Sequence, residues 1–182
     1  MPILQVYYPE GALQGERKSS LAKALTEVLL TMEGGAQTQG GRAFATVLFT
    51  EVSHSDWWVG GHTDTTYVQA PGKFLVRVSV PEGYMNQAHK TEVHSAVSRA
   101  IVDIESPGAP GDGTNVLVII EEVLEGNWGA AGKTLTLTKI ADAVGLSRTG
   151  ERFKWVRAYF DAKARSYAAA KYPADAGGLL AP

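Results

Sequence analysis

Hydrophobic positions along the first third of the chain switch between two periods. Residues 2–8 alternate between polar and β-branched or aromatic side chains, which predicts a strand that ends at the turn residues 9–11. From 16 to 32 the apolar residues recur at helical spacing and leave the charged residues for solvent. We expect a Gly- and Gln-rich loop over 34–41 and a second strand over 43–52. A strand, a helix and a strand predict one crossover unit with parallel strands.

The same order of elements then returns. Residues 73–80 predict a strand, and a helix follows from about Asn86, whose side chain can cap the first turn. We expect a Gly- and Pro-rich loop over 106–113 and a fourth strand over 115–123.

The two halves also match residue by residue, which indicates an internal duplication. Tyr8-Pro9-Glu10-Gly11 aligns with Val80-Pro81-Glu82-Gly83, residues 47–52 align with 118–123, Trp57 aligns with Trp128, and Gly61 aligns with Gly132. The prediction is an α/β fold in which tandem β-α-β repeats form a four-stranded sheet backed by two helices. The units would span about 2–61 and 74–132 within a domain of residues 1–133.

Residues 134–182 predict a helical extension, with a strand-like stretch at 135–137 and helices at 139–144 and about 151–172. Residues 139–147 have the pattern of the first half of a DNA-binding helix-turn-helix. A formal net charge of -2 argues against a nucleic-acid partner. The basic amphipathic stretch 152–171 is compatible with a membrane surface, but we expect it to pack across an oligomer or over the mouth of a site.

Composition narrows the function classes. The chain is 45% hydrophobic and 20% charged, as expected of a globular protein with a sizeable core. It has no cysteine, and its four histidines lack the spacing of metal ligands, so no metal site is expected. The first residues resemble neither a signal peptide nor a membrane span, and we expect a cytoplasmic protein without a membrane partner.

The order of motifs in the first unit is distinctive. A strand that begins Met1-Pro2 is followed by Glu10-Gly11, a helix, a strand that ends in Thr50-Glu51, an aromatic residue at Trp57, and Gly60-Gly61. This layout resembles the 4-oxalocrotonate tautomerase-like subunits of the tautomerase superfamily. The doubled length resembles its fused branch, to which cis-3-chloroacrylic acid dehalogenase-like proteins also belong. The resemblance covers about residues 2–132 and implies a homotrimer, a small-molecule substrate and no cofactor.

The resemblance gives Pro2 the central role. It implies removal of Met1, after which Pro2 carries a free secondary amine that shuttles a proton between carbon and oxygen positions of an enol or keto acid. Partial burial would favour the neutral amine, which is the form that acts as a general base. The aligned residue of the second unit is Phe74, which is internal, so each chain has at most one such site.

The chain departs from the family pattern where the substrate carboxylates would bind. The two arginine positions of the tautomerases hold Ala12 and Thr46 in the first unit, and Tyr84 and Leu117 in the second. The helix histidine of the dehalogenases is replaced by Leu29, which argues against the dehalogenase mechanism.

The remaining candidates for substrate binding are aromatic and basic side chains around Pro2. Trp57, Trp128 and Tyr84 would form aromatic walls, Thr46 would stand at a lost arginine position, and Arg42 or Arg77 would replace a lost arginine. Core or interface packing of the tryptophans, and surface pairing of the arginines, are the structural alternatives.

These residues predict a Pro2-dependent tautomerase or isomerase that acts on a small enolisable keto acid or ketone. A Pro2-dependent hydratase or decarboxylase of a small unsaturated or β-keto acid is the first alternative. The second alternative is a non-catalytic relative that binds a ligand or only assembles.

Overall fold

The computed structural model describes residues 2–32, 37–108, 113–174 and 176–180. Its centre is a four-stranded sheet in the order β2-β1-β3-β4. The strands are β1 (Ile3–Pro9), β2 (Thr46–Val52), β3 (Phe74–Pro81) and β4 (Val116–Val123). The predicted fold class is confirmed.

Strand pairing reflects the duplication. β1 and β2 are parallel, as are β3 and β4, whereas β1 and β3 meet antiparallel at the centre with Val6 opposite Val76. Each parallel pair is joined by a helix crossover, and the antiparallel junction joins the two units into one sheet.

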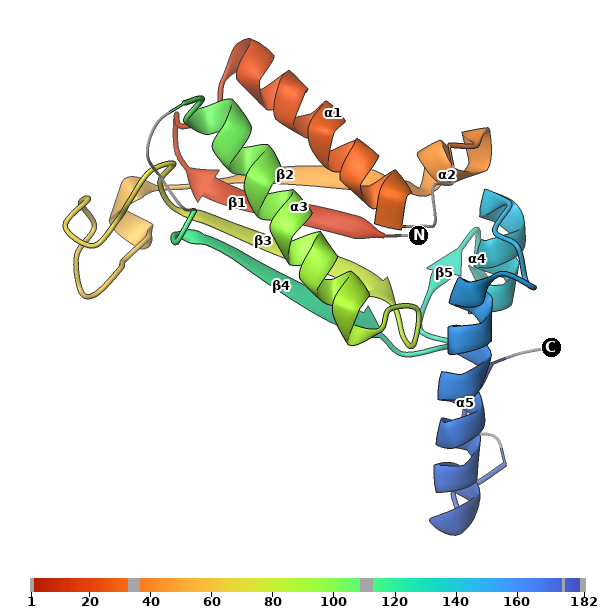
Figure 1. Cartoon of the computed structure of the whole chain (residues 1–182). Helices are drawn as coiled ribbons and strands as arrows, with labels where there is room; N and C mark the ends of the chain where they lie inside the picture. The colour runs from red at the N-terminus through yellow and green to blue at the C-terminus, as the bar shows by residue number, and fades with distance from the viewer. Residues whose placement is uncertain (1, 33–36, 109–112, 175, 181–182) are drawn as a thin grey trace.

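Two long helices cover one face of this sheet (Figure 1). They are α1 (Gly15–Met32) and α3 (Gln87–Glu105), and Asn86 caps α3 as predicted, accepting a 2.9 Å hydrogen bond from the amide of His89. Fully buried side chains from the helices, including Leu21, Leu25, Leu29, Val97 and Ile101, pack on the inward residues of the strands, among them Leu4, Val6, Val76 and Val78. Each such side chain contributes about 2 kcal/mol by leaving water.

The connection between α1 and β2 differs from the prediction. A short helix, α2 (Gln39–Phe44), occupies much of the expected loop and of the start of the expected strand, and β2 begins only at Thr46. Thr38 caps this helix by accepting a bond from the Gly41 amide. Gly40 packs so closely on the Ala143 carbonyl of α4 that a Cβ would clash, so its glycine serves helix contact rather than a loop. Residues 34–36 of the predicted loop lie outside the described part of the chain.

The extension contains two helices and a small hairpin. The hairpin pairs β5 (Gly129–Ala130) with β6 (Lys133–Thr134), and α4 (Leu137–Val144) and α5 (Glu151–Ala169) follow. The strand predicted at 135–137 is wrong, because Thr136 caps α4 and Leu137 begins it. α4 and α5 lie at one end of the sheet, next to the start of β1, while the turn η1 (His54–Asp56) lies at the opposite end (Figure 1). Residues 109–112 of the predicted loop 106–113 lie outside the described part.

A buried ionic cluster fastens α5 to the end of β3. The Glu82 carboxylate accepts bonds from Lys163 at 2.7 Å, from the Tyr159 hydroxyl at 2.9 Å and from the Glu125 amide at 3.1 Å. Burial raises the pKa of Glu82, but these hydrogen bonds and the Lys163 charge outweigh it, so the pKa is lowered. Phe153, Val156 and Phe160 add a buried apolar stripe on the same helix.

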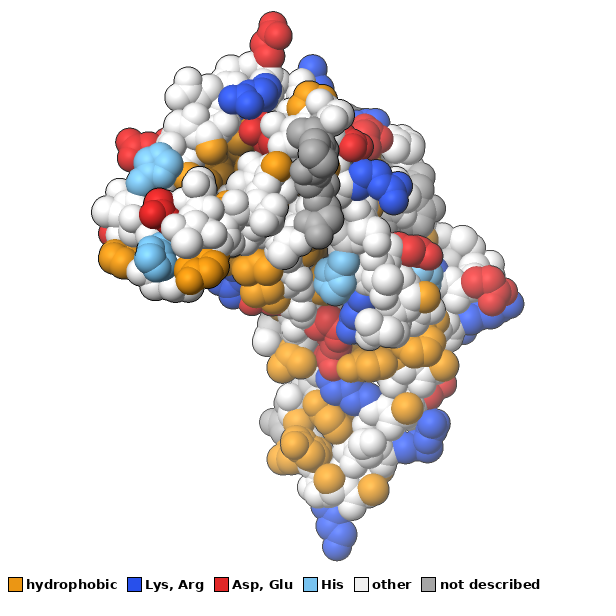
Figure 2. All heavy atoms as spheres, turned by 60° about the vertical axis from the view of Figure 1, so that its left-hand side comes forward, with side chains coloured by type: hydrophobic (Ala, Val, Ile, Leu, Met, Phe, Trp, Pro, Cys, Tyr) orange, Lys and Arg blue, Asp and Glu red, His pale blue; other side chains and the backbone are white. Residues whose placement is uncertain are grey.

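The second face of the sheet is not covered by any described helix (Figure 1). It exposes Leu48, Leu117 and Ile119, which are 48%, 58% and 47% accessible, and between them the ion pair of Arg77 with Glu121. In the space-filling view, hydrophobic side chains form separate groups among charged ones, and α5 projects below the body of the molecule (Figure 2).

Candidate functional site

Pro2 lies immediately before β1 and is buried. Its carbonyl accepts a 3.4 Å hydrogen bond from the amide of Thr46, which extends the β1–β2 ladder by one step. The ladder therefore places the proline ring at the edge of the core, where β1 starts.

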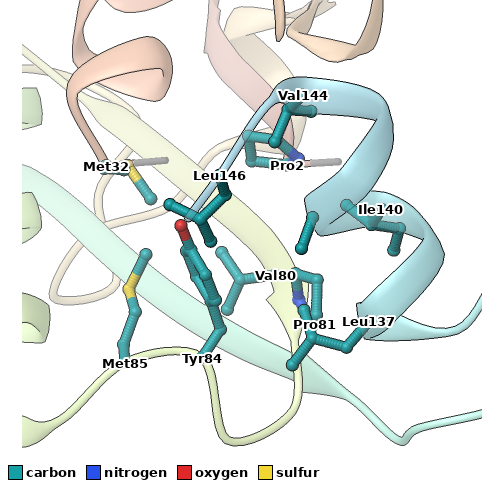
Figure 3. A pocket seen from close by; sticks show the side chains of 11 residues that line it. Pro2, Met32, Val80, Pro81, Tyr84, Met85, Leu137, Ile140, Val144 and Leu146 are labelled. Atoms are coloured by element: carbon teal, nitrogen blue, oxygen red, sulfur yellow. The ribbon is translucent and has the colours of Figure 1, made fainter. Parts of the chain in front are cut away.

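Pro2 lines a small apolar pocket. α4 supplies Leu137, Ile140 and Val144 on one side, and Met32, Tyr84 and Met85 lie on the other (Figure 3). Val80, Pro81, Ala141 and Leu146 complete the wall. Its volume is about 20 Å³, which is room for about one water molecule. Apart from Pro2, Tyr84 is the only described residue of this wall with a polar side-chain atom.

α4 is held over Pro2 by its own N-terminus. The buried Glu125 carboxylate accepts bonds of 3.0 and 3.1 Å from the Leu137 amide, at the positive end of the helix. Burial raises the pKa of Glu125, while the Leu137 bond opposes that shift. At the other end of the helix, the Thr38 hydroxyl donates to the Val144 carbonyl at 3.0 Å. The cover on Pro2 is thus fixed at both ends.

A larger groove adjoins this pocket. It lies between α1, α3 and the start of α5, has a volume of about 270 Å³, and shares Met32 and Met85 with the Pro2 pocket. Its apolar floor includes Val28 and Val93, and its polar residues include His89 and Arg152. Burial, and secondly the charge of Arg152, lower the pKa of His89.

Two of the predicted substrate-binding residues lie at Pro2. Tyr84 lines the pocket, and the backbone of Thr46 bonds to Pro2, although the Thr46 side chain is exposed.

The two predicted arginines lie elsewhere. Arg42 is on α2 and pairs with Glu27 at 3.0 Å on the outer surface. Arg77 pairs with Glu121 on the uncovered face of the sheet. Both therefore already have carboxylate partners.

The two tryptophans also lie away from Pro2. Trp57 lines a shallow hollow with Tyr7 and Leu75 at the opposite end of the strands, next to η1. Trp128 is 7% accessible, and its indole nitrogen has no partner among the described residues. Within one chain, therefore, neither forms a wall around Pro2.

Sequence reasoning missed α4 as the cover of Pro2. We expected the basic segment 152–171 to pack across an oligomer or over a site mouth, whereas the residues of the extension that line the Pro2 pocket include Leu137, Ile140 and Val144. The available signal was their spacing, since positions three and four apart form one apolar stripe on a helix.

The Pro2 pocket suits proton transfer to and from carbon. An apolar surrounding favours the neutral form of an amine, and a neutral secondary amine can accept a proton from an acidified C–H bond. No charged side chain of a described residue lines the pocket. Among the described residues no cluster of metal-ligating side chains exists, and no helix is long and apolar enough to cross a bilayer.

Comparisons with known proteins agree with this architecture. The family model described as putative oxalocrotonate tautomerase enzyme matches residues 1–139. No curated protein matches the chain.

Several solved structures share the fold. An asymmetric trimer of wild-type F6 fused 4-OT is 23% identical, with a TM-score of 0.58, over 72% of this chain and 94% of that one. N1, a member of the cis-3-chloroacrylic acid dehalogenase family, is 19% identical, with a TM-score of 0.57, over 73% and 82%. Pt0534 inactivated by 2-oxo-3-pentynoate is 20% identical, with a TM-score of 0.56, over 71% and 93%. At these identities the likeness concerns the fold.

Proposed function

Because the chain belongs to the family of putative oxalocrotonate tautomerase enzymes, we propose that it is a tautomerase or isomerase whose base is the amine of Pro2. The observation that carries this proposal is the position of Pro2 in the wall of a small apolar pocket. Removal of Met1 exposes the secondary amine that the reaction needs.

The proposed reaction moves one proton on a small enolisable keto acid or ketone. The Pro2 nitrogen takes a proton from the carbon next to the carbonyl, the C–H electron pair forms a C=C bond, and the carbonyl π pair moves to oxygen. Pro2 then returns the proton to another position of the enol, so nothing is consumed. Tyr84 is the pocket residue that can donate a hydrogen bond to the enol oxygen.

Assembly as a homotrimer is part of the proposal. The uncovered sheet face carries exposed Leu48, Leu117 and Ile119, and association would remove these apolar side chains from water. F6 fused 4-OT was solved as a trimer. Trp57 and Arg77, which lie away from Pro2 within one chain, are the residues we expect to gain contacts in the assembly.

Labelling of the amine tests the base. We expect purified protein to lack Met1 and to react once, at Pro2, with 2-oxo-3-pentynoate, the compound that inactivated Pt0534. Intact mass and mapping of the labelled peptide give both answers. The nitrogen adds to the alkyne carbon, one π bond breaks towards the carbonyl, and the resulting enolate takes a proton at carbon as nitrogen loses its own.

Activity tests the role of that amine. The Pro2→Ala variant should lose about a hundredfold or more of the tautomerase rate with enolisable keto acids, which is the range of a lost general base. Pro9→Ala, at the far end of the same strand, is the matched control and should keep the rate. Retained Met1, or equal rates in Pro2→Ala and wild type, contradicts the proposal.

One observation favours the non-catalytic alternative. The pocket at Pro2 has a volume of only about 20 Å³, so a substrate needs Met32, Met85 or α4 to move before it reaches the amine. Absence of labelling at a correctly processed Pro2 would favour this alternative.

A further inference from the structure

The wall between the Pro2 pocket and the neighbouring groove consists of flexible side chains. Met32 and Met85 line both spaces, and methionine has three rotatable bonds and adapts readily to irregular contacts. The groove has a volume of about 270 Å³, and we expect rotation of these two shared side chains to open a path from it to the pocket. The groove therefore adjoins the Pro2 pocket and offers more room for a small molecule than the pocket itself does.

Arg152 is a cation without a carboxylate partner in this groove. Its guanidinium lies 5.0 Å from the centre of the Tyr84 ring and makes a long bond of 3.5 Å to the Tyr84 carbonyl. None of the described carboxylates lies within ion-pair distance of it. A guanidinium has five N–H donors in a planar fork that matches a carboxylate, so most of its donors remain available.

The other ionisable groups of the groove leave Arg152 as its unpaired cation. Glu27 is paired with Arg42 on the rim, and Glu92 is exposed to water. His89 has a lowered pKa and a buried Nδ1 without a described partner. A neutral imidazole of this kind can exchange hydrogen bonds with a bound polar group without adding charge.

We infer that the groove binds a carboxylate of the substrate at Arg152, while the enolisable carbonyl of the same molecule reaches Pro2 between Met32 and Met85. This inference rests on the proposed function and names its substrate class. Arg152 on α5, outside both units, would thus take the role of the arginines that are missing from the two family positions.

The geometry separates the carboxylate from the reacting carbon. Arg152 does not line the Pro2 pocket, but its guanidinium lies 5.0 Å from the centre of the Tyr84 ring, and Tyr84 does line the pocket. We therefore expect a carboxylate bound at Arg152 to lie several bonds away from the carbonyl that reaches Pro2. The substrate class is therefore a keto acid whose carboxylate stands at the far end of a short apolar chain.

Two alkynyl ketones that differ only at the remote end test this arrangement. The probes are 6-oxooct-7-ynoate and its methyl ester, which share the same reactive group. We expect the carboxylate to label Pro2 faster than the ester in wild type, measured by mass spectrometry over time. In Arg152→Gln this preference should fall by about tenfold to a hundredfold, as for the loss of a charge-assisted bond.

Matched variants exclude a general effect of charge. Arg157 lies on the exposed side of the same helix, 5.9 Å from the Phe153 ring, so Arg157→Gln should leave the preference unchanged. Arg152→Lys, which retains the charge without the fork, should keep part of it. The inference is wrong if the preference survives in Arg152→Gln or falls equally in Arg157→Gln.

Binding of a non-reactive acid separates this inference from the proposed reaction. Hexanoate should shift the imidazole NMR signals of His89 in wild type, and the dissociation constant should rise at least tenfold in Arg152→Gln. Hexanamide should bind weakly to both proteins. If hexanoate binds but neither alkynyl ketone labels Pro2, the reaction fails while the carboxylate site stands. If hexanoate does not bind, the inference is overturned even where Pro2 reacts.

Discussion

The two β-α-β units share a backbone plan but differ in what their first strands lead into. Glu10 and Glu82 follow β1 and β3 at aligned positions, and each donates its amide to the last residue of the partner strand, Val52 or Val123. The Glu10 side chain is exposed, whereas Glu82 is 5% accessible and binds α5. A duplicated position has thus become an attachment point in one copy only, because the extension covers only that end of the sheet.

Removing the Glu82 carboxylate should give the largest difference in stability between substitutions at aligned positions of the two units. Glu82→Ala leaves Lys163, whose side chain is 14% accessible, without its partner, and we expect a loss of about 3–5 kcal/mol in the free energy of unfolding. Glu10→Ala, at the aligned exposed position, should change it by less than about 0.5 kcal/mol. Urea denaturation of both variants measures the difference. Equal losses would mean that α5 is not attached through Glu82.

The glycines after these glutamates give the next largest contrast. Gly11 and Gly83 both have positive φ, 76° and 69°, so alanine at either costs about 1 kcal/mol. At Gly83 an added Cβ would also collide with the Tyr159 ring, whereas at Gly11 its nearest neighbour is the end of Gln14 at 3.6 Å. Thermal unfolding should show a clearly larger fall for Gly83→Ala. Similar falls for both variants would contradict the close packing of α5.

The Tyr159 hydroxyl, which binds Glu82 in the second unit, makes the stability of the protein depend on pH in the alkaline range. Burial, followed by its bond to the Glu82 carboxylate, raises the pKa of Tyr159 to about 12. The folded state therefore retains a proton that the unfolded chain loses near pH 10, so this stabilisation is complete below pH 10 and is lost as the pH rises towards 12.

Tyr159→Phe tests that assignment. The variant should lose about 1–2 kcal/mol at neutral pH through the missing hydrogen bond. It should also show a smaller decline in stability between pH 10 and 12 than wild type does. An identical decline in both proteins would assign the effect to other groups.

The smallest expected effect concerns His89, whose aligned residue in the first unit is Arg17. Arg17 pairs with Glu105 at 3.4 Å, whereas burial, and secondly the charge of Arg152, lower the pKa of His89. Protonation of His89 therefore opposes folding, so its unfavourable effect is absent well above pH 6.5 and grows as the pH falls below that value. His89→Gln should remove a small part of the loss of stability between pH 7 and 5, measured by urea denaturation. A steeper loss in the variant would reverse the sign of this assignment.

Periodicity and internal repetition were enough to predict the sheet and its two covering helices. Val6, Leu25, Val76 and Val97 lie in the core because alternating and helical spacings each present one apolar face. Contacts between distant segments were not predictable in this way. Gly40 was predicted to lie in a loop. In the structure it packs against the carbonyl of Ala143, where a Cβ would clash, so the glycine is needed for close helix packing rather than for a turn.

The residues around Pro2 were likewise predicted only in part. Pro2 and Tyr84 were predicted, because they belong to the aligned repeats that carry the family layout. Arg42 and Arg77 were chosen for their chemical type, and their carboxylate partners, Glu27 and Glu121, lie on another helix and another strand. Trp57 and Trp128 were chosen from aligned positions, but neither lines the Pro2 pocket within one chain. The cover from α4 and the unpaired guanidinium of Arg152 come from residues beyond the second repeat, where no aligned position existed to guide the prediction.

The cover over Pro2 also has a consequence in time. A ribosome synthesises β1 long before α4, so the start of the chain emerges when nothing yet exists to shield it. Leu137, Ile140 and Val144, which line the pocket with Pro2, are therefore absent when the N-terminus first emerges. We expect the removal of Met1 that the proposed function requires to take place during this interval, before α4 has been synthesised.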